Sequence, residues 1–137
     1  MNGIKLEYGS IMMTEDEKSL EKSQESLLQS YNDIITILKA MGHPNRLKIL
    51  ILLLTEPLSF QTLLEELKLK KSALASHLTS LKDNLLIEKI QHGTYKITND
   101  GVSFLQAIER TYTQSKSREM SQQRYRPVKT FLDRKKE

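Results

Sequence analysis

Hydrophobic residues recur with a helical period along most of the chain, so the pattern predicts a mainly α-helical protein. From Glu15 to Met41 they are spaced by seven, four, three, four and three residues, as in an a/d seam that Gly42 ends as a C′ glycine. So broad an apolar stripe must be buried, either in the core of the single chain or in a dimer interface. The seam and the residues that widen it are Leu20, Leu27, Leu28, Tyr31, Ile34, Ile35, Leu38 and Met41.

A second helix is predicted to begin at Pro44, because proline fits the first position of a helix. Its residues are apolar nearly all round as far as Leu54, which predicts a buried helix. The pair Glu56-Pro57 should stop it, since the residue before a proline avoids helical geometry.

Two short helices follow, separated by a tight connection. Ser59 is a candidate cap for a helix over Phe60 to Leu67, and the next helix runs from about Lys71 to Asn84. The three residues between them, 68–70, make the pair a helix-turn-helix arrangement.

The stretch LLIEKIQHGTYKIT predicts a β-hairpin with a two-residue turn at His92-Gly93. That turn pairs Ile90 with Tyr95 and Lys89 with Lys96. The second pair places two like charges opposite each other, which destabilises a strand pair. A nearby phosphate would relieve the repulsion, or the two lysines splay apart in water.

A last helix is predicted from about Asp100 to Ser115, capped by Thr98 or Asn99. Together these elements give a mainly α fold with a small β-hairpin (α+β), in the order of a winged helix-turn-helix. The helical spacing of this last element is carried by Val102, Leu105, Ile108 and Tyr112.

The helix over 71–84 has two unlike sides at about 100° per residue. Leu74, Leu78, Leu81 and Leu85 form the predicted core side. The opposite side is small and uncharged, as close approach to a base edge in the major groove requires. Alternatively, these are merely tolerated surface residues. The candidate base-reading residues are Ser72, Ser76 and Thr79, with Ala75 at their edge.

Basic side chains border this helix and the hairpin, where they are candidates for phosphate contacts. The helix start also attracts anions. His92, at the hairpin tip, is a candidate for a minor-groove or phosphate contact, or is a plain turn residue. The candidate phosphate contacts are Lys70, Lys71, Lys82, Lys89, Lys96 and His92.

The 137 residues fit one compact domain with tails. We expect a flexible segment over 1–14, the winged domain with flanking dimerisation helices over 15–115, and a basic tail over 116–137. Residues 68–92 carry five lysines against two acidic residues, and residues 109–137 carry nine basic against four acidic residues. Residues 1–33 instead carry three lysines against seven acidic residues. The two basic segments suit a polyanion partner.

The sequence argues against three classes of protein: membrane proteins, secreted proteins and enzymes. The longest apolar run, 49–54, is too short to span a bilayer, and the first residues lack a secretory pattern, so we expect a cytoplasmic protein without a membrane partner. No nucleophile–base pair, phosphate loop or paired-carboxylate pattern indicates an enzyme, and no cofactor is expected.

The chain has no cysteine, which excludes a disulfide framework and a thiolate metal site. Its three histidines are not clustered in sequence, so no metal site is predicted. His77 is interpreted as a packed or DNA-facing residue at the core edge rather than a ligand. Arg46 is interpreted as making a structural hydrogen bond or salt bridge, with a phosphate contact as the alternative.

Three segments resemble the ArsR-type winged-helix regulators over roughly residues 34–108. In ILKAMGHPNRLKILILLL the matching residues are Leu38, Gly42, Pro44, Arg46, Ile49 and Leu50. In KKSALASHLTSLKDNLLIEKI, similar to the family's recognition helix and first wing strand, they are Ser72, His77, Leu78, Leu81, Leu85 and Ile87. TYKITNDG resembles the closing wing strand and the start of the last helix.

The resemblance implies a sequence-specific transcriptional regulator of double-stranded DNA, by default a repressor, that acts as a homodimer on a palindromic operator. The family's cysteine metal sensor is excluded here, and residues 100–137 lack the histidines that other members use. The sequence specifies no effector. The expected dimer-interface residues, from the first and last helices, are Leu20, Leu27, Tyr31, Ile34, Leu38, Leu105, Ile108 and Tyr112.

Two alternatives stay open. In the first, the domain is a winged-helix module that binds another protein. In the second, it is a nonspecific architectural DNA-binding protein. Salt dependence separates a phosphate contact from a largely apolar protein contact. The tail adds nonspecific DNA affinity or binds another acidic partner through Arg124, Arg126, Lys129, Arg134, Lys135 and Lys136.

Overall fold

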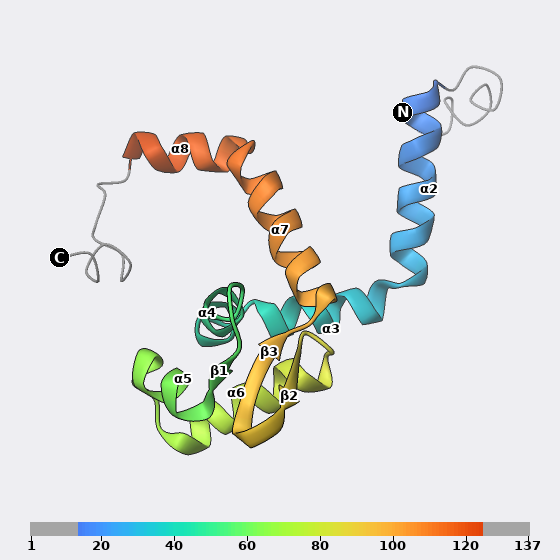
Figure 1. Cartoon of the computed structure of the whole chain (residues 1–137). Coiled ribbons are helices and arrows are strands. Elements are labelled where there is room, and N and C mark those ends of the chain that lie inside the picture. The colour runs from blue at the N-terminus through green and yellow to red at the C-terminus, as the bar shows by residue number, and fades with distance from the viewer. Residues whose placement is uncertain (1–13, 125–137) are drawn as a thin grey trace.

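The computed structural model describes residues 14–124 and consists mostly of helices with one small antiparallel sheet (Figure 1). This confirms the predicted fold class. The elements in chain order are α2 (Glu15–Gln29), α3 (Tyr31–Met41), α4 (Pro44–Leu52), β1 (Leu58–Ser59), α5 (Phe60–Leu67), α6 (Lys71–Asp83), β2 (Ile87–Ile90), a 3-10 turn (Gln91–Gly93), β3 (Thr94–Ile97), α7 (Asn99–Thr113) and α8 (Lys116–Arg124).

The core lies where α4, α5 and α6 meet the sheet and the first turns of α7. It is built only from hydrophobic side chains, and no polar or charged residue within 14–124 is buried. The largest fully buried side chains are Ile49, Leu50, Leu53, Leu63, Leu74, Leu81, Leu86 and Ile87.

Side-chain caps fix the starts of three helices that surround this core. Ser59 Oγ accepts a hydrogen bond from the Thr62 amide at 3.0 Å, and Thr98 Oγ1 accepts one from the Gly101 amide at 3.0 Å. His43 caps α4, in which Pro44 takes the first position as predicted. Each cap satisfies an amide that has no partner inside its helix. The predicted caps at Ser59 and Thr98 are confirmed.

Helix α4 ends earlier than the Glu56-Pro57 signal predicts. Its last residue is Leu52, and its outer side is not buried, because Ile51 and Leu54 are exposed. The prediction of a helix buried all round is therefore wrong for that side. The residues that follow include β1, a two-residue strand that the apolar pattern did not predict.

The sheet has the order β1-β3-β2, with both pairs antiparallel. The predicted hairpin register is wrong by one residue, because the loop contains three residues, Gln91 to Gly93. His92 and Gly93 both adopt positive φ angles there, 60° and 66°. Lys96 therefore lies opposite Glu88 and Lys89 opposite Tyr95, so the expected pair of facing lysines does not form.

The predicted continuous helix from Glu15 to Met41 is broken at Ser30, where the chain turns sharply between α2 and α3 (Figure 1). Ser30 has φ −105° and ψ 17°, and its amide still bonds the carbonyl of Ser26 at 3.1 Å. Serine and asparagine offer the backbone alternative hydrogen bonds, which weakens a helix at such a place. The a/d seam is therefore divided between two helices.

Two predicted conformations near helix ends are also corrected. Gly42 ends α3, but with φ −78° it is not the left-handed C′ residue expected there. Leu85 lies beyond the end of α6 with φ 61° and is 70% exposed, so it is not on the core side of that helix. Leu86, which is fully buried, takes the core position instead.

Helix α7 ends at Thr113, and α8 follows after a break at Gln114 and Ser115. The expectation of a flexible segment falls almost wholly on residues 1–13, and most of the expected basic tail falls on 125–137; both lie outside the described residues. None of the helices in the described part of the chain is long and apolar enough to cross a membrane.

Candidate DNA-contacting surface

Helix α6 is anchored by one side and open on the other. Leu74, Leu78 and Leu81 are at most 2% exposed, because they pack into the core. Lys68, in a left-handed conformation with φ 54°, ends α5 and reverses the chain toward α6. The tight connection thus fixes the side that α6 presents to solvent.

The open side of α6 carries the candidate base-reading residues. The two serines, the alanine and the threonine all lie in exposed positions. The surface combines short hydroxyl groups, which donate and accept hydrogen bonds, with methyl groups, and it carries no acidic side chain among these positions. These residues, which we call the α6 outer face, are Ser72, Ala75, Ser76 and Thr79.

Lysines border this face at both ends. Lys70 and Lys71 lie exposed at the start of α6, where no side chain caps the first amides, and Lys82 lies exposed in its last turn. A helix start with free amides and two lysines suits a phosphate oxygen. The bordering charges fit a groove with phosphates on either side.

The wing residues are exposed but are distributed differently from expectation. Lys89 lies opposite Tyr95, and Lys96 lies opposite Glu88. Because Glu88 and Lys89 are neighbours on β2, they point to opposite faces of the hairpin, and so do the two lysines. His92 is exposed at the tip. The wing can therefore direct only one of these two lysines toward a given phosphate.

The structure brings together two histidines that the sequence separates. The rings of His43 and His77 have centroids 4.4 Å apart and are tilted by 46°. His43 Nδ1 accepts the Asn45 amide at 3.1 Å, whereas His77 Nδ1 is buried without a hydrogen-bond partner. Burial lowers the pKa of His77, and the nearby His43 and Arg46 lower it further. The surroundings of His77, between α6 and the start of α4, thus disfavour its charged form.

Arg46 joins the same junction to α3. Its Nε donates to the carbonyl of Ala40 at 2.7 Å and its Nη2 to the carbonyl of Lys39 at 3.1 Å. These bonds satisfy carbonyls at the end of α3, which agrees with a structural role for Arg46. The histidine contact was not predicted, because only the fold brings positions 43 and 77 together.

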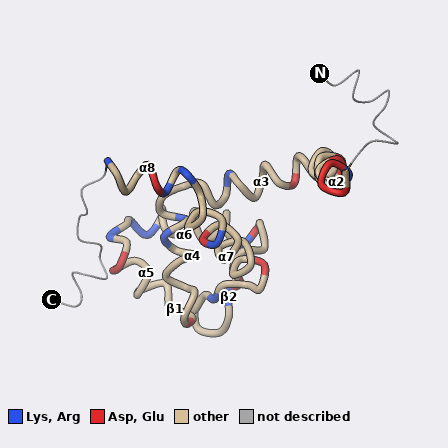
Figure 2. The backbone as a smooth tube through the Cα atoms, turned by 90° about the horizontal axis from the view of Figure 1, so that it is seen from above, with Lys and Arg blue, Asp and Glu red and all other residues tan. Residues whose placement is uncertain are grey.

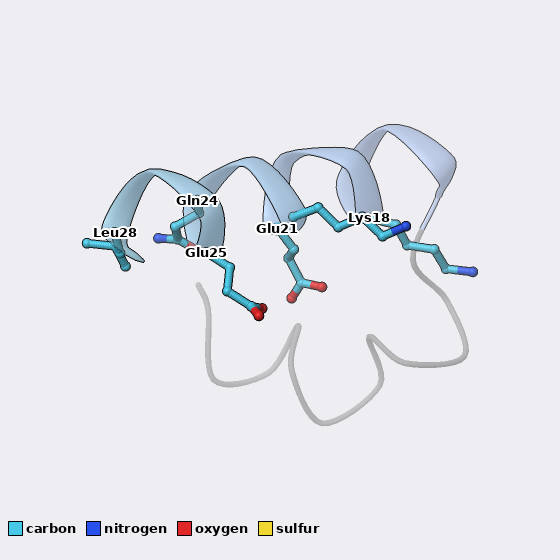
Figure 3. Close-up of a pocket in the computed structure, with 6 residues that line it drawn as sticks. Lys18, Glu21, Gln24, Glu25 and Leu28 are labelled. Atoms are coloured by element: carbon cyan, nitrogen blue, oxygen red, sulfur yellow. The ribbon is translucent and has the colours of Figure 1, made fainter. Parts of the chain in front are cut away.

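No metal centre accompanies the histidine pair. Within residues 14–124, no three histidine or acidic side chains gather in a way that would hold an ion. The shallow hollow shown in Figure 3 lies along α2, far in sequence from the α6 outer face. Its described lining is mostly charged and polar: Lys18, Glu21, Lys22, Gln24, Glu25 and Leu28.

The expected dimer residues are mostly uncovered in the single chain. Leu105 is the exception, because it is 7% exposed and belongs to the core. Ile34 is half-buried. The exposed ones are Leu20, Leu27, Tyr31, Leu38, Ile108 and Tyr112.

Comparisons with known proteins agree with this fold. The family model of the bacterial regulatory proteins of the arsR family matches residues 43–89, from the cap of α4 into β2. The arsenical resistance operon repressor of Staphylococcus xylosus is 33% identical over 79 residues, which make up 56% of this chain and 76% of that repressor.

Two solved structures show the same architecture. Reduced HlyU from Vibrio cholerae N16961 is 29% identical with a TM-score of 0.55, and the match covers 66% of this chain and 99% of HlyU. NolR from Sinorhizobium fredii is 29% identical with a TM-score of 0.53, covering 69% of this chain and 94% of NolR. The winged fold, the α6 outer face and these matches together show that the chain belongs to the ArsR family of bacterial regulatory proteins and is a DNA-binding transcriptional regulator.

Proposed function

We propose that this regulator is a repressor that acts in the cytoplasm as a homodimer on a two-fold symmetric operator in double-stranded DNA. Each copy inserts α6 into the major groove of one half-site. Because two-fold symmetry relates the copies, the half-sites are palindromic and about one turn of DNA apart. The relatives named as repressors, among them the S. xylosus protein, support the sign of regulation.

The observation that carries this proposal is the small, uncharged α6 outer face, opposite three buried leucines. Ser72, Ser76, Thr79 and the methyl group of Ala75 contact base edges, because short side chains allow the helix backbone to approach the groove floor. Lys70, Lys71 and Lys82 contact phosphates and set the register of the helix on the duplex.

The wing has a supporting role. Lys89, Lys96 and His92 are exposed and contact the phosphate backbone or the adjacent minor groove. Glu88 lies opposite Lys96 and offsets its charge, so the wing adds little to the attraction. Sequence preference therefore depends mainly on α6.

The uncovered apolar side chains of α2, α3 and α7 support the dimer. Large exposed hydrophobic residues that gather on a few elements mark an interaction surface. Leu38 on α3 and Ile108 and Tyr112 on α7 are about half exposed in the single chain. Their burial against a second copy is the contribution expected of the first and last helices.

Selection from a pool of random duplexes at two salt concentrations tests the proposal. Enrichment of a two-fold palindrome supports it, and binding that weakens by orders of magnitude with a modest salt increase supports phosphate contacts. Salt-sensitive binding without enrichment would indicate a nonspecific architectural protein. No binding at low salt would contradict the proposed role of α6.

A pair of variants locates the contact. Ser76→Glu with Thr79→Glu places two carboxylates on the α6 outer face, and we expect duplex affinity to fall on the order of a hundredfold. Ser103→Glu with Gln106→Glu adds the same charge at exposed positions of α7 and is the matched control. Equal affinities for the two double variants would refute the assignment of α6 as the reading helix.

A further inference from the structure

His77 lies on the border between the two sides of α6. Its neighbours in sequence are the exposed Ser76 of the α6 outer face and the buried Leu78 of the core. The Nδ1 atom of His77 is buried and has no hydrogen-bond partner among the described residues. A buried polar atom without a partner carries a cost in free energy, so this side chain is a candidate for a functional role.

The side chains that approach His77 are fixed by backbone hydrogen bonds. The ring of His43 has its centroid 4.4 Å from that of His77, and its Nδ1 accepts the Asn45 amide at 3.1 Å. The guanidinium of Arg46 donates to two carbonyls at the end of α3, at 2.7 and 3.1 Å. Neither neighbour can withdraw from His77 without losing these bonds. A repulsion at this point must therefore be relieved by movement of His77 and α6.

The junction lies between α6 and the helix that leads out of the winged body. Helix α6 packs against both α3 and α4. Figure 2 shows α4 and α6 beside each other in the body, and both overall views show α3 leading away from it toward α2 (Figures 1 and 2). A displacement at His77 therefore changes the orientation of α6 relative to α3. In the proposed dimer, this orientation decides how each α6 meets its half-site.

The charges around His77 disfavour a proton on its ring. Burial lowers its pKa most, and the charges of His43 and Arg46, both at the start of α4, lower it further. On α6 itself, no charged residue lies three or four positions away from His77. Besides α3 and α4, the helix packs against α5 and β2. The acidic side chains on these four elements are all exposed, and none of them acts on His77: Asp33, Glu65, Glu66 and Glu88.

The charged form of His77 does not fit this site. Both ring nitrogens of an imidazolium are donors, so Nδ1 would carry a buried N–H without an acceptor, whichever nitrogen held the proton before. The positive charge would also lie near the guanidinium of Arg46. Exposure of the ring to water removes both costs, because water accepts the hydrogen bond and screens the charge. Protonation thus favours a state in which α6 has left its seat against α4.

We propose that the junction of His43, Arg46 and His77 is a pH-sensitive joint, in which proton uptake by His77 releases α6 from the orientation that reads DNA. Duplex affinity then falls when the pH is lowered. This direction is distinctive, because added positive charge otherwise strengthens the attraction of a protein to phosphates. The inference rests on the proposed function, since α6 must be the reading helix.

Duplex affinity at constant ionic strength tests the inference. The probe is a fluorescent duplex from the selected pool, and anisotropy gives its affinity between about pH 7.5 and about pH 5. We expect the wild-type affinity to fall about three- to tenfold, since one proton changes an affinity by at most tenfold per pH unit. His77→Gln should remove this fall. His92→Gln is the control: whatever its affinity at neutral pH, it should keep the wild-type fall.

A measurement on the wild-type chain does not depend on the folding of the His77 variant. The chain has three histidines, so NMR signals of their rings can be assigned with His43→Asn and His92→Gln. We expect the amide signals of α6 to shift with the same midpoint as the ring of His77. Circular dichroism over the same pH range should show unchanged helix content.

The other outcomes overturn the inference. Amide signals of α6 that do not follow the titration of His77, or a folded His77→Gln variant that keeps the fall, would assign the pH dependence to other groups and leave the proposed function intact. Loss of helix content in step with affinity would show that the fall comes from unfolding. A duplex that is not bound at neutral pH would refute the proposed function, and the inference with it.

Discussion

Helices α6 and α2 have 13 and 15 residues, and both carry leucines along one side. In α6 the chain itself buries those leucines, so the helix presents a small polar face of fixed orientation. In α2 the leucines stay exposed, and the polar side is densely charged. An amphipathic helix is therefore available for recognition through whichever side the fold leaves uncovered: polar for α6 and apolar for α2.

The largest expected effect is a difference in the free energy of unfolding between a leucine variant in α6 and one in α2. Leu78→Ala in α6 should lower the free energy of unfolding by about 2–5 kcal/mol, because it leaves a cavity in the core. Leu27→Ala in α2 should change it by less than about 0.5 kcal/mol when the chain is monomeric. Urea unfolding at low protein concentration measures both. Equal losses would show that α2 is packed after all.

The next largest effect is a difference in duplex binding between lysine variants at the start of α6 and lysine variants in α2. Lys70→Ala with Lys71→Ala should weaken duplex binding and reduce the slope of log affinity against log salt by about two, or about one for each lost phosphate contact. Lys18→Ala with Lys22→Ala removes the same charge from α2 and is the control, with no change expected. Fluorescence anisotropy at several salt concentrations gives the slopes, and a slope unaltered in the first variant would exclude phosphate contacts there.

A smaller effect compares two leucines of identical exposure. Leu85 and Leu20 are both 70% exposed, but Leu85 has φ 61° outside any helix whereas Leu20 lies inside α2. Leu85→Gly should raise stability by up to about 1 kcal/mol, because it relieves a left-handed conformation. Leu20→Gly should instead reduce helix content, measured by circular dichroism. Destabilisation by Leu85→Gly would mean that its side chain has a packing role.

The smallest effect concerns pH. The lowered pKa of His77 means that the unfolded chain takes up this proton more readily than the folded one. The stability contribution of neutral His77 is therefore complete above the ordinary histidine value of about 6.5 and is lost as the pH falls through the folded-state pKa. His77→Gln should reduce the change in the free energy of unfolding between about pH 7.5 and about pH 5, measured by urea titrations. The same slope in both proteins would show that His77 is not the source of the pH dependence.

The central part of the fold was predictable because local signals and burial agree there. Pro44, the cap at Ser59 and the leucines of α6 each predict the element that the structure contains. The residues of the α6 outer face could be predicted from helical geometry alone, since they lie opposite the leucines of the core. The assignment of its residues to bases and phosphates stays a prediction.

The parts that were not predictable depend on interactions beyond the local pattern. The break at Ser30 interrupts a spacing that fits a single helix. Among the described residues, none of those in α2 is buried, so packing within residues 14–124 does not hold α2 in line with α3. The hairpin register depends on His92 accepting a positive φ angle, which the sequence does not announce. The contact between His43 and His77 joins the cap of α4 to α6, and no local pattern in the sequence indicates it.

The division of α6 into two sides also has an evolutionary consequence. The four positions that we propose to face the bases, Ser72, Ala75, Ser76 and Thr79, are exposed and are separate from the leucines that pack into the core. If these sites read the bases as proposed, changes there should alter the preferred DNA sequence at almost no cost in folding free energy, since surface substitutions usually shift it by less than about 0.5 kcal/mol. The scaffold is therefore suited to retargeting, both by gene duplication followed by drift and by libraries randomised at four codons.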